Sequence, residues 1–238
     1  MIRDSRKSRE YFDKWIDYDR ERLASMSKVI GAFPQILNSR HLVYLHDFTK
    51  KHLQILVYRF SRGDELRDFE GDVDAAIEAF AVFSRALNAT AEGKDAYLMD
   101  IDRSQQALWL AYFAHSIYDR GTKLTPSIQQ LLLTPDMLLN EVSGCILGQK
   151  LLADSDCVSQ KLHEPLLDFC KLQKIDENKM IQFVTTWYKK CGTSYWHETH
   201  DREDRGYFGY WCFEAALVSR ALGYGEESLY SSIYYPRW

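Results

Sequence analysis

The sequence predicts an all-α protein, a multi-helix bundle of about eight or nine helices. Long stretches place apolar side chains at helical spacing on one face and charged side chains on the other, as amphipathic helices do. Prolines and most glycines fall where this periodicity breaks, so they mark helix ends. No stretch alternates apolar and polar residues between turn signals, as a half-buried strand would. The 238 residues can form one large domain or two helical halves packed together.

Four long helices are predicted in the first half of the chain. Residues 4–30 place Phe12, Ile16 and Leu23 on one face among interleaved charges, which predicts an amphipathic helix and not a membrane anchor. Each of the other three ends close to a glycine, which is common just after a helix. They are expected at residues 39–62, 71–91 and 95–120.

Shorter helices are predicted in the second half. Thr125-Pro126 and Thr134-Pro135 each offer an N-cap residue followed by a proline at the first helical position, so they mark two helix starts. The turn before the first of them divides the chain into expected helical regions 1–122 and 123–238. Three later helices are expected at residues 165–172, 176–191 and 208–222.

The composition argues against several classes of protein. A net charge of -4 and a pI near 6.0 do not fit a protein that wraps nucleic acid through a basic surface, and a basic partner is the better match. The five cysteines are odd in number and widely spaced, with no CxxC pair, which argues against a disulfide framework and against a zinc module. We therefore expect reduced thiols.

Neither a signal peptide nor a membrane-spanning segment is expected from the sequence. The N-terminal stretch is charged from its third residue and has no apolar core of signal-peptide length. The most apolar run, residues 107–117, is too short to span a bilayer. We expect a cytoplasmic protein that does not bind membranes.

Histidines and acidic residues raise the question of a metal site in two places. His46-Asp47 is a pair of the kind that all-α phosphohydrolases use to hold a divalent metal, but the upstream histidine of such a site is missing. His197 and His200 are three residues apart, whereas the HExxH motif needs four, and the mixed charges around them are typical of a solvated loop. A metal-dependent phosphohydrolase built on these four residues is the alternative hypothesis.

Other catalytic signatures are missing from the sequence. There is no GxSxG nucleophile elbow, no phosphate-binding loop and no dinucleotide fingerprint. Cys191 precedes a glycine near a helix end, but no base is placed beside it by local spacing. We expect no cofactor, no bound metal and no catalytic residue.

An acidic segment follows the second predicted helix, from Gly63 to Asp74. The helix dipole of the next helix explains part of this charge, and a solvated loop is the simplest interpretation. The sharper hypothesis is a surface for a basic partner, because complementary charge accelerates encounter and suppresses wrong partners. The carboxylates proposed for that surface are Asp64, Glu65, Asp68, Glu70, Asp72 and Asp74.

The stretch GYWCFEAALVSRALGYG lies near the C-terminus, and Glu214 is a carboxylate within it. Placed on a helix, it forms one apolar stripe with Glu214 at the edge; the stripe consists of Trp211, Ala215, Val218 and Leu222. A carboxylate beside apolar surface must find hydrogen bonds or a cation, or its pKa shifts. No second carboxylate is placed nearby for acid-base work. We therefore expect Glu214 to have a structural partner, such as an arginine or backbone donors in the C-terminal tail, and Trp211 to pack in the core.

The C-terminal stretch resembles the signature of a known protein family. The run YFGYWCFEAALVSRALG, residues 207–223, with YYP at residues 234–236, resembles the signature of the C-terminal region of the PoNi family. PoNi proteins are immunity proteins that accompany polymorphic nuclease toxins of bacteria. The N-terminal region resembles its usual companion in Arg3-Asp4, Tyr11-Phe12 and FSRG at residues 60–63. The signature residues are Trp196, His200, Tyr207, Gly209, Tyr210, Trp211, Glu214, Tyr235 and Pro236.

The resemblance implies an all-helical protein that binds and neutralises a DNA-cleaving toxin delivered between bacterial cells, and it implies no catalysis. It does not locate the interface. A toxin that grips DNA should carry a basic active-site groove, so the acidic segment is our candidate for covering it. Direct block of the active site and capture of an inactive toxin conformation both fit, and so does a homo-oligomer. A third hypothesis is a structural adaptor that binds a partner without protecting cells.

Overall fold

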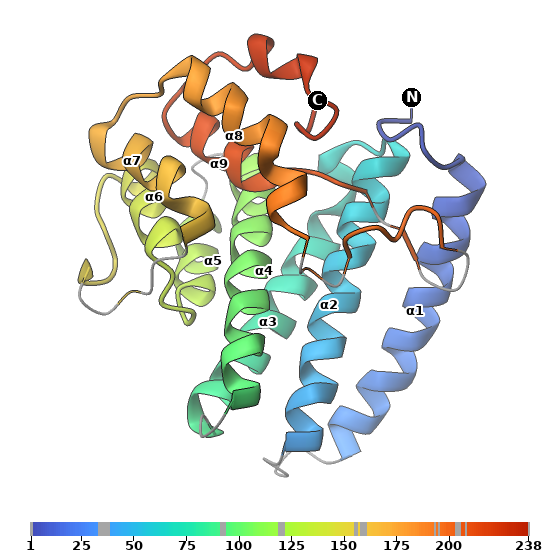
Figure 1. The fold of residues 1–238 in the computed structure, drawn as a ribbon. Helices are drawn as coiled ribbons and strands as arrows, with labels where there is room; N and C mark the ends of the chain where they lie inside the picture. Colours follow the sequence, from blue (N-terminus) through green and yellow to red (C-terminus); the bar gives the residue numbers. More distant parts are fainter. Residues whose placement is uncertain are drawn as a thin grey trace. The chain divides into compact units, whose positions relative to one another are not determined.

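The structure is a computed structural model that describes residues 2–32, 39–90, 94–118, 122–154, 157, 161–192, 194, 196–202, 206–207 and 209–237. Within these residues it contains nine α-helices and no β-strand, so the predicted all-α class is confirmed (Figure 1). The α-helices are α1 Arg9–Ala32, α2 Ser39–Arg62, α3 Glu70–Thr90, α4 Lys94–Tyr118, α5 Leu124–Leu131, α6 Met137–Leu147, α7 Glu164–Leu172, α8 Glu177–Lys190 and α9 Phe213–Ala221. Short 3-10 helices are η1 Leu66–Phe69, η3 Lys161–His163 and η4 Glu227–Ser231.

The long N-terminal helices follow the hydrophobic periodicity closely. Helix α2 has the predicted bounds, and α3 and α4 differ from theirs by no more than two residues at either end. Helix α1 begins at Arg9, later than predicted. The reason is a tertiary contact, because the backbone N–H groups of Arg3 and Asp4 both donate to the Ser61 carbonyl, at 3.0 and 3.1 Å. These residues are therefore held at the end of α2 and lie outside the helix.

Three shorter helices start at residues other than those predicted. Helix α5 begins at Leu124, with Lys123 as its N-cap. Helix α6 is capped by Asp136, whose carboxylate accepts from the Leu139 N–H at 2.9 Å, and not by Thr134. A carboxylate two residues closer to the helix outcompetes the threonine hydroxyl, which is buried.

Helix α9 begins at Phe213, which leaves Trp211 before the helix. Gly209 has φ of 115°, a conformation that interrupts a helix and that glycine adopts without steric cost. The Cys212 N–H then donates to the Tyr234 carbonyl at 2.8 Å, so the backbone there pairs with the C-terminal tail. The predicted helical stripe from Trp211 onward was wrong at its first position. Phe208, its predicted first residue, lies outside the described residues.

The chain forms two compact units, and the boundary between them falls inside α4. Unit 1 consists of Met1–Gln106 and Glu198–Gly209, and unit 2 consists of Ala107–His197 and Tyr210–Trp238. A short segment late in the sequence therefore completes the N-terminal unit. The sequence-based division after residue 122 concerned the regions of a family and stays a prediction.

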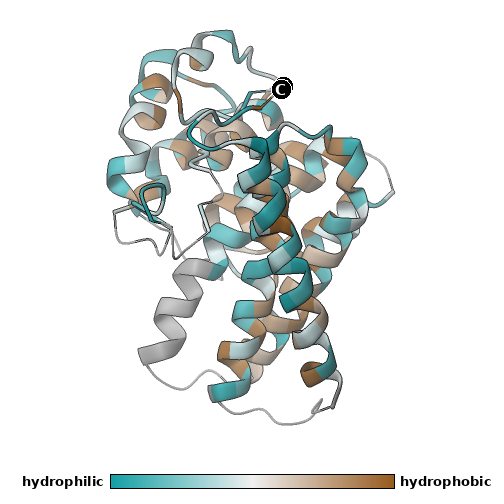
Figure 2. Ribbon diagram, turned by 90° about the vertical axis from the view of Figure 1, so that its right-hand side faces the viewer, coloured by the Kyte–Doolittle hydropathy of each residue, from teal (hydrophilic) through white to brown (hydrophobic). Residues whose placement is uncertain are grey.

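Unit 1 is built on three neighbouring helices, with α2 packed against both α1 and α3. Brown and teal faces alternate along the helices in Figure 2, as expected for amphipathic helices that bury one side. Large aromatic side chains fill the core, among them Phe12, Tyr58, Phe60 and Phe80, each at most 1% exposed. None of the helices searched in the described residues is long and apolar enough to cross a bilayer.

Unit 2 has an aromatic core around the C-terminal part of α4. Phe213, the first residue of α9, lies 5.4 Å from the Trp109 ring and 5.1 Å from the Phe113 ring, centroid to centroid. Trp196 stacks on Trp187 of α8 at 5.3 Å. Aromatic pairs at such spacings add stabilisation beyond the area that they bury. Much of the high tryptophan and tyrosine content is therefore structural.

Candidate functional site

The acidic segment between α2 and α3 has an inner part that is neutralised by arginines. Arg59 and Arg62, both on the last turn of α2, hold Asp64 with Nε–Oδ distances of 2.9 and 2.8 Å. Burial of Asp64 opposes ionisation, but the hydrogen bonds from Arg62 and Arg59 outweigh it and lower the pKa of its carboxyl group. Arg59 also binds Asp72, and Arg62 also binds Asp13. These carboxylates are committed to the scaffold.

The outer part of the segment faces solvent. Glu65, Asp68 and Asp74 are exposed. The Arg67–Asp68 pair is 4.0 Å apart with side chains 86% and 59% exposed, a geometry that contributes little because water screens it. The six predicted carboxylates, which we call the acidic surface, therefore differ in how far they are exposed. Asp64 and Asp72 are paired, Glu70 is half-buried, and Glu65, Asp68 and Asp74 face solvent.

The N-terminal residues hold this segment in place. Arg3 donates from Nη1 to the Phe60 carbonyl at 2.9 Å and to the Asp64 carbonyl at 2.8 Å, while its guanidinium lies 4.7 Å from the centre of the Phe60 ring. Two of the three N-terminal elements of the resemblance, Arg3-Asp4 and FSRG, are therefore in direct contact. Sequence reasoning listed them separately and missed that they form one structure.

Tyr207, a signature residue of the C-terminal region, also contacts the N-terminal residues. The Tyr207 hydroxyl donates to Asp4 Oδ2 at 2.6 Å, and the Tyr207 N–H donates to the Tyr11 hydroxyl at 2.7 Å. Arg6 donates from Nη1 to the Tyr207 hydroxyl at 3.2 Å. Figure 1 shows this late segment beside α1 and α2. We call Arg3, Asp4, Tyr11 and Tyr207 the clasp, and it joins the first residues of the chain to residue 207.

Most of the remaining signature residues are buried in unit 2. Trp196, Tyr210, Trp211 and Glu214 are each at most 4% exposed, and Pro236 is also buried. The tail is tied down at Glu226, whose Oε1 accepts from the Tyr235 hydroxyl at 2.8 Å and from Arg220 at 3.3 Å. A buried, well-packed set of side chains of this kind supports the fold more directly than it contacts a partner.

Glu214 lies fully buried in the first turn of α9. A carboxylate is favoured there by the helix dipole. Two buried thiols, those of Cys191 and Cys212, lie close by. Burial raises the pKa of both thiols, and the negative charge of Glu214 raises it further. A structural partner for Glu214 stays a prediction, and its environment is one that keeps neighbouring thiols protonated.

The four residues of the phosphohydrolase hypothesis have different environments. His46 is buried against Phe83, and burial lowers the pKa of its imidazole to about 4, whereas Asp47 is exposed. His197 stacks on Tyr188 at 4.2 Å, and His200 lies 3.3 Å from Asp201. Across the described part of the chain, no three His, Cys, Asp or Glu side chains come together as a metal site requires.

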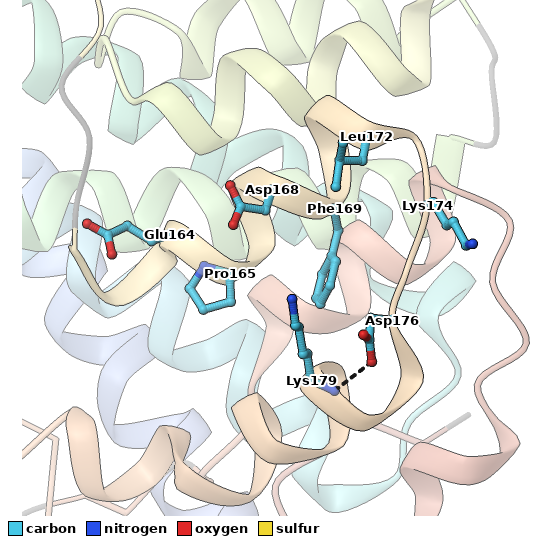
Figure 3. Close-up of a pocket in the computed structure, with 8 residues that line it drawn as sticks. All are labelled: Glu164, Pro165, Asp168, Phe169, Leu172, Lys174, Asp176 and Lys179. Carbon is cyan, nitrogen blue, oxygen red and sulfur yellow. Dashed lines mark hydrogen bonds between the residues drawn. The ribbon is translucent and has the colours of Figure 1, made fainter.

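A pocket of about 470 Å³ lies between α7 and α8 in unit 2 (Figure 3). Phe169 and Leu172 supply apolar surface, and Leu172 is 74% exposed. Charges of both signs surround them, so the pocket does not select a ligand by charge. Its lining residues are Glu164, Pro165, Asp168, Phe169, Leu172, Lys174, Asp176 and Lys179.

In the comparison with known proteins, a protein-family model matches part of the chain. Residues 134–237 match the model of the C-terminal region of PoNe immunity proteins (PoNi). No curated protein and no solved structure matches the chain at a significant level. The matched span contains every signature residue that carried the resemblance, so the resemblance is confirmed there. Over residues 134–237, the chain is therefore similar to the C-terminal region of the PoNi immunity proteins.

Proposed function

We propose that this protein binds a cognate antibacterial DNase toxin and neutralises it by stoichiometric occlusion, protecting the producing cell and its kin. The family match over residues 134–237 carries the proposal, because the proteins that this family model describes are immunity proteins. The inhibitor works by occupying the toxin, so it requires no turnover and no cofactor. The encounter takes place in the cytoplasm, a compartment in which the free cysteines stay reduced.

The acidic surface is our candidate for the toxin interface. A nuclease must offer positive charge to DNA phosphates, so exposed carboxylates held on a rigid support complement it electrostatically. Arg59, Arg62 and the clasp fix the backbone from which Glu65 and Asp68 project. Rigid presentation matters because a preordered surface loses less conformational entropy on binding. The proposed contact residues are Glu65, Asp68 and Asp74, with Asp64 and Asp72 as supports.

The first experiment measures cleavage of plasmid DNA by the nuclease encoded next to this gene while the protein is titrated in. Inhibition should increase linearly and stop at a fixed molar ratio, as expected for tight occlusion. Catalytic removal of DNA or of the toxin would inhibit at substoichiometric amounts. An active nuclease that is unaffected by an excess of folded protein contradicts the proposal for that partner.

Charge reversal tests the acidic surface separately. Asp68→Lys should lower the association rate with the toxin by roughly 3- to 10-fold at low salt, and the loss should shrink at high salt. Asp168→Lys on α7 makes the same change of charge at an exposed aspartate of unit 2, and is the matched control. Equal effects of the two substitutions would place the interface elsewhere while leaving the immunity role intact.

A further inference from the structure

Two thiols lie next to each other where α6 packs against α7. Cys145 is half-buried on α6, Cys170 is 1% exposed on α7, and neither takes part in a disulfide. The Cys145 thiol donates to the Cys170 carbonyl oxygen at 3.9 Å, which places the two cysteines side by side. The amide Nε2 of Gln173 donates to Cys145 Sγ at 3.5 Å. The arrangement brings together a solvent-accessible sulfur, a buried sulfur and an amide donor.

The two sulfurs differ in their readiness to ionise. Hydrogen bonds from the Cys170 thiol, and more weakly from Gln173, stabilise a thiolate at Cys145 and lower its pKa from an ordinary 9.0 to about 7. The pKa of Cys170 is raised, because its hydrogen stays in the bond to Cys145 and the group is buried. A thiolate with a pKa near the ambient pH is the nucleophilic form of cysteine, so Cys145 should react first.

Another close pair of thiols in the same unit lacks this chemistry. Cys191 and Cys212 lie near Glu214, and both burial and that negative charge raise their pKa values. Both are at most 3% exposed. Proximity of two thiols is therefore not sufficient for their oxidation to a disulfide, because an oxidant must reach one of the thiols in its ionised form. Among the cysteine pairs considered, Cys145 and Cys170 combine closeness with access.

We propose that Cys145 and Cys170 are an oxidisable dithiol that a hydroperoxide converts into an intramolecular disulfide. The Cys145 thiolate attacks one peroxide oxygen, the O–O bond breaks, and Cys145 becomes a sulfenic acid while hydroxide leaves and takes up the proton that Cys145 had lost. Cys170 sulfur then attacks the sulfenic sulfur. The S–S bond forms, the S–O bond breaks, and the departing hydroxide takes the Cys170 proton. Two thiols and one hydrogen peroxide give one disulfide and two waters.

This dithiol is independent of toxin binding, so its test uses the full chain alone. Purified reduced protein is treated with a small excess of hydrogen peroxide at pH 7, blocked with iodoacetamide, digested and analysed by mass spectrometry without reduction. Before blocking and digestion, the intact mass should fall by about 2 Da, and the digest should contain a cross-linked peptide pair with Cys145 and Cys170. Dithiothreitol should restore both thiols.

Three variants define the order of events. Cys170→Ser removes the resolving thiol, so Cys145 should accumulate as a sulfenic acid that dimedone traps. Cys145→Ser should abolish both products. Cys157→Ser, at another partly exposed cysteine of unit 2, is the matched control and should form the disulfide as the wild type does. In the reduced wild type, iodoacetamide should label Cys145 at least about fivefold faster than Cys157 at pH 7.

The proposal fails if oxidised wild-type protein lacks the Cys145–Cys170 peptide pair, or if a different cysteine is oxidised first. It also fails if Cys145 is converted directly to sulfinic acid while Cys170 remains alkylatable. Circular dichroism checks that each variant is folded. If Cys170→Ser is not folded, the peptide map and the labelling rates of the wild type decide the question without it.

Discussion

Gly206 shows how a single residue joins distant parts of unit 1. A Cβ atom at this position would lie 1.9 Å from the Tyr58 hydroxyl oxygen and 3.1 Å from an atom of the Trp15 ring. Only a glycine backbone can approach α1 and α2 this closely, and the approach brings the neighbouring Tyr207 to Asp4 and Tyr11. The clasp therefore depends on a residue that has no side chain of its own.

Gly206→Ala is expected to lower the free energy of unfolding by roughly 1–3 kcal/mol, because a methyl group is forced into a filled space. Removing the hydroxyl that it meets, in Tyr58→Phe, should relieve part of that cost. Urea denaturation of both single variants and of the double variant measures the coupling. Strictly additive effects would mean that the Tyr58 hydroxyl is not what excludes a side chain at residue 206.

At the scale of secondary-structure elements, the periodicity of apolar residues predicts the long helices. The ends of the short helices are decided by competition between neighbouring capping residues. Helix α2 needs no correction, because its apolar stripe is long and strong. The start of α6 is different, since Thr134 and Asp136 are both good N-cap residues and lie two residues apart. Sequence spacing cannot choose between them, whereas the observed Asp136 hydrogen bond does.

Substitution at the two candidate caps tests this choice. Asp136→Ala should destabilise the protein by about 1 kcal/mol, within the usual range for a lost N-cap. Thr134→Val keeps the shape of a buried side chain whose hydroxyl has no hydrogen bond, so it should be neutral or slightly stabilising. Thermal melts of both variants suffice. A larger loss from Thr134→Val than from Asp136→Ala would restore Thr134 as the cap.

At the scale of the whole molecule, buried histidines make stability depend on pH. Burial lowers the pKa of His46 in unit 1 and of His163 in unit 2 to about 4, compared with 6.5 in the unfolded chain. Below pH 6.5 the unfolded state therefore binds protons that the native state rejects, and the free energy of unfolding falls as the pH decreases toward 4. Each histidine can contribute a slope of about 1.4 kcal/mol per pH unit in that window.

Urea unfolding at several values between pH 6.5 and pH 5 should reveal this slope, above the range in which most carboxylates begin to titrate. His163→Leu removes one titrating group from a site that is 1% exposed, so its stability curve should be flatter than that of the wild type. Parallel curves for the two proteins would show that His163 takes up its proton equally in the native and unfolded states.

The amino-acid sequence by itself determined the all-α class, the approximate bounds of α2, α3 and α4 and the C-terminal signature, because periodicity and short motifs are local properties. It also identified six carboxylates as an acidic segment that begins after α2 and continues into the start of α3. Only the tertiary structure decided that Asp64 and Asp72 are paired with arginines. It also decided that Tyr207 meets Asp4, and that Cys145 meets Cys170. Tyr207 and Asp4 are brought together by chain folding over a long sequence separation, and the pairing of Asp64 depends on the side-chain geometry at the end of α2, so no local pattern encodes either.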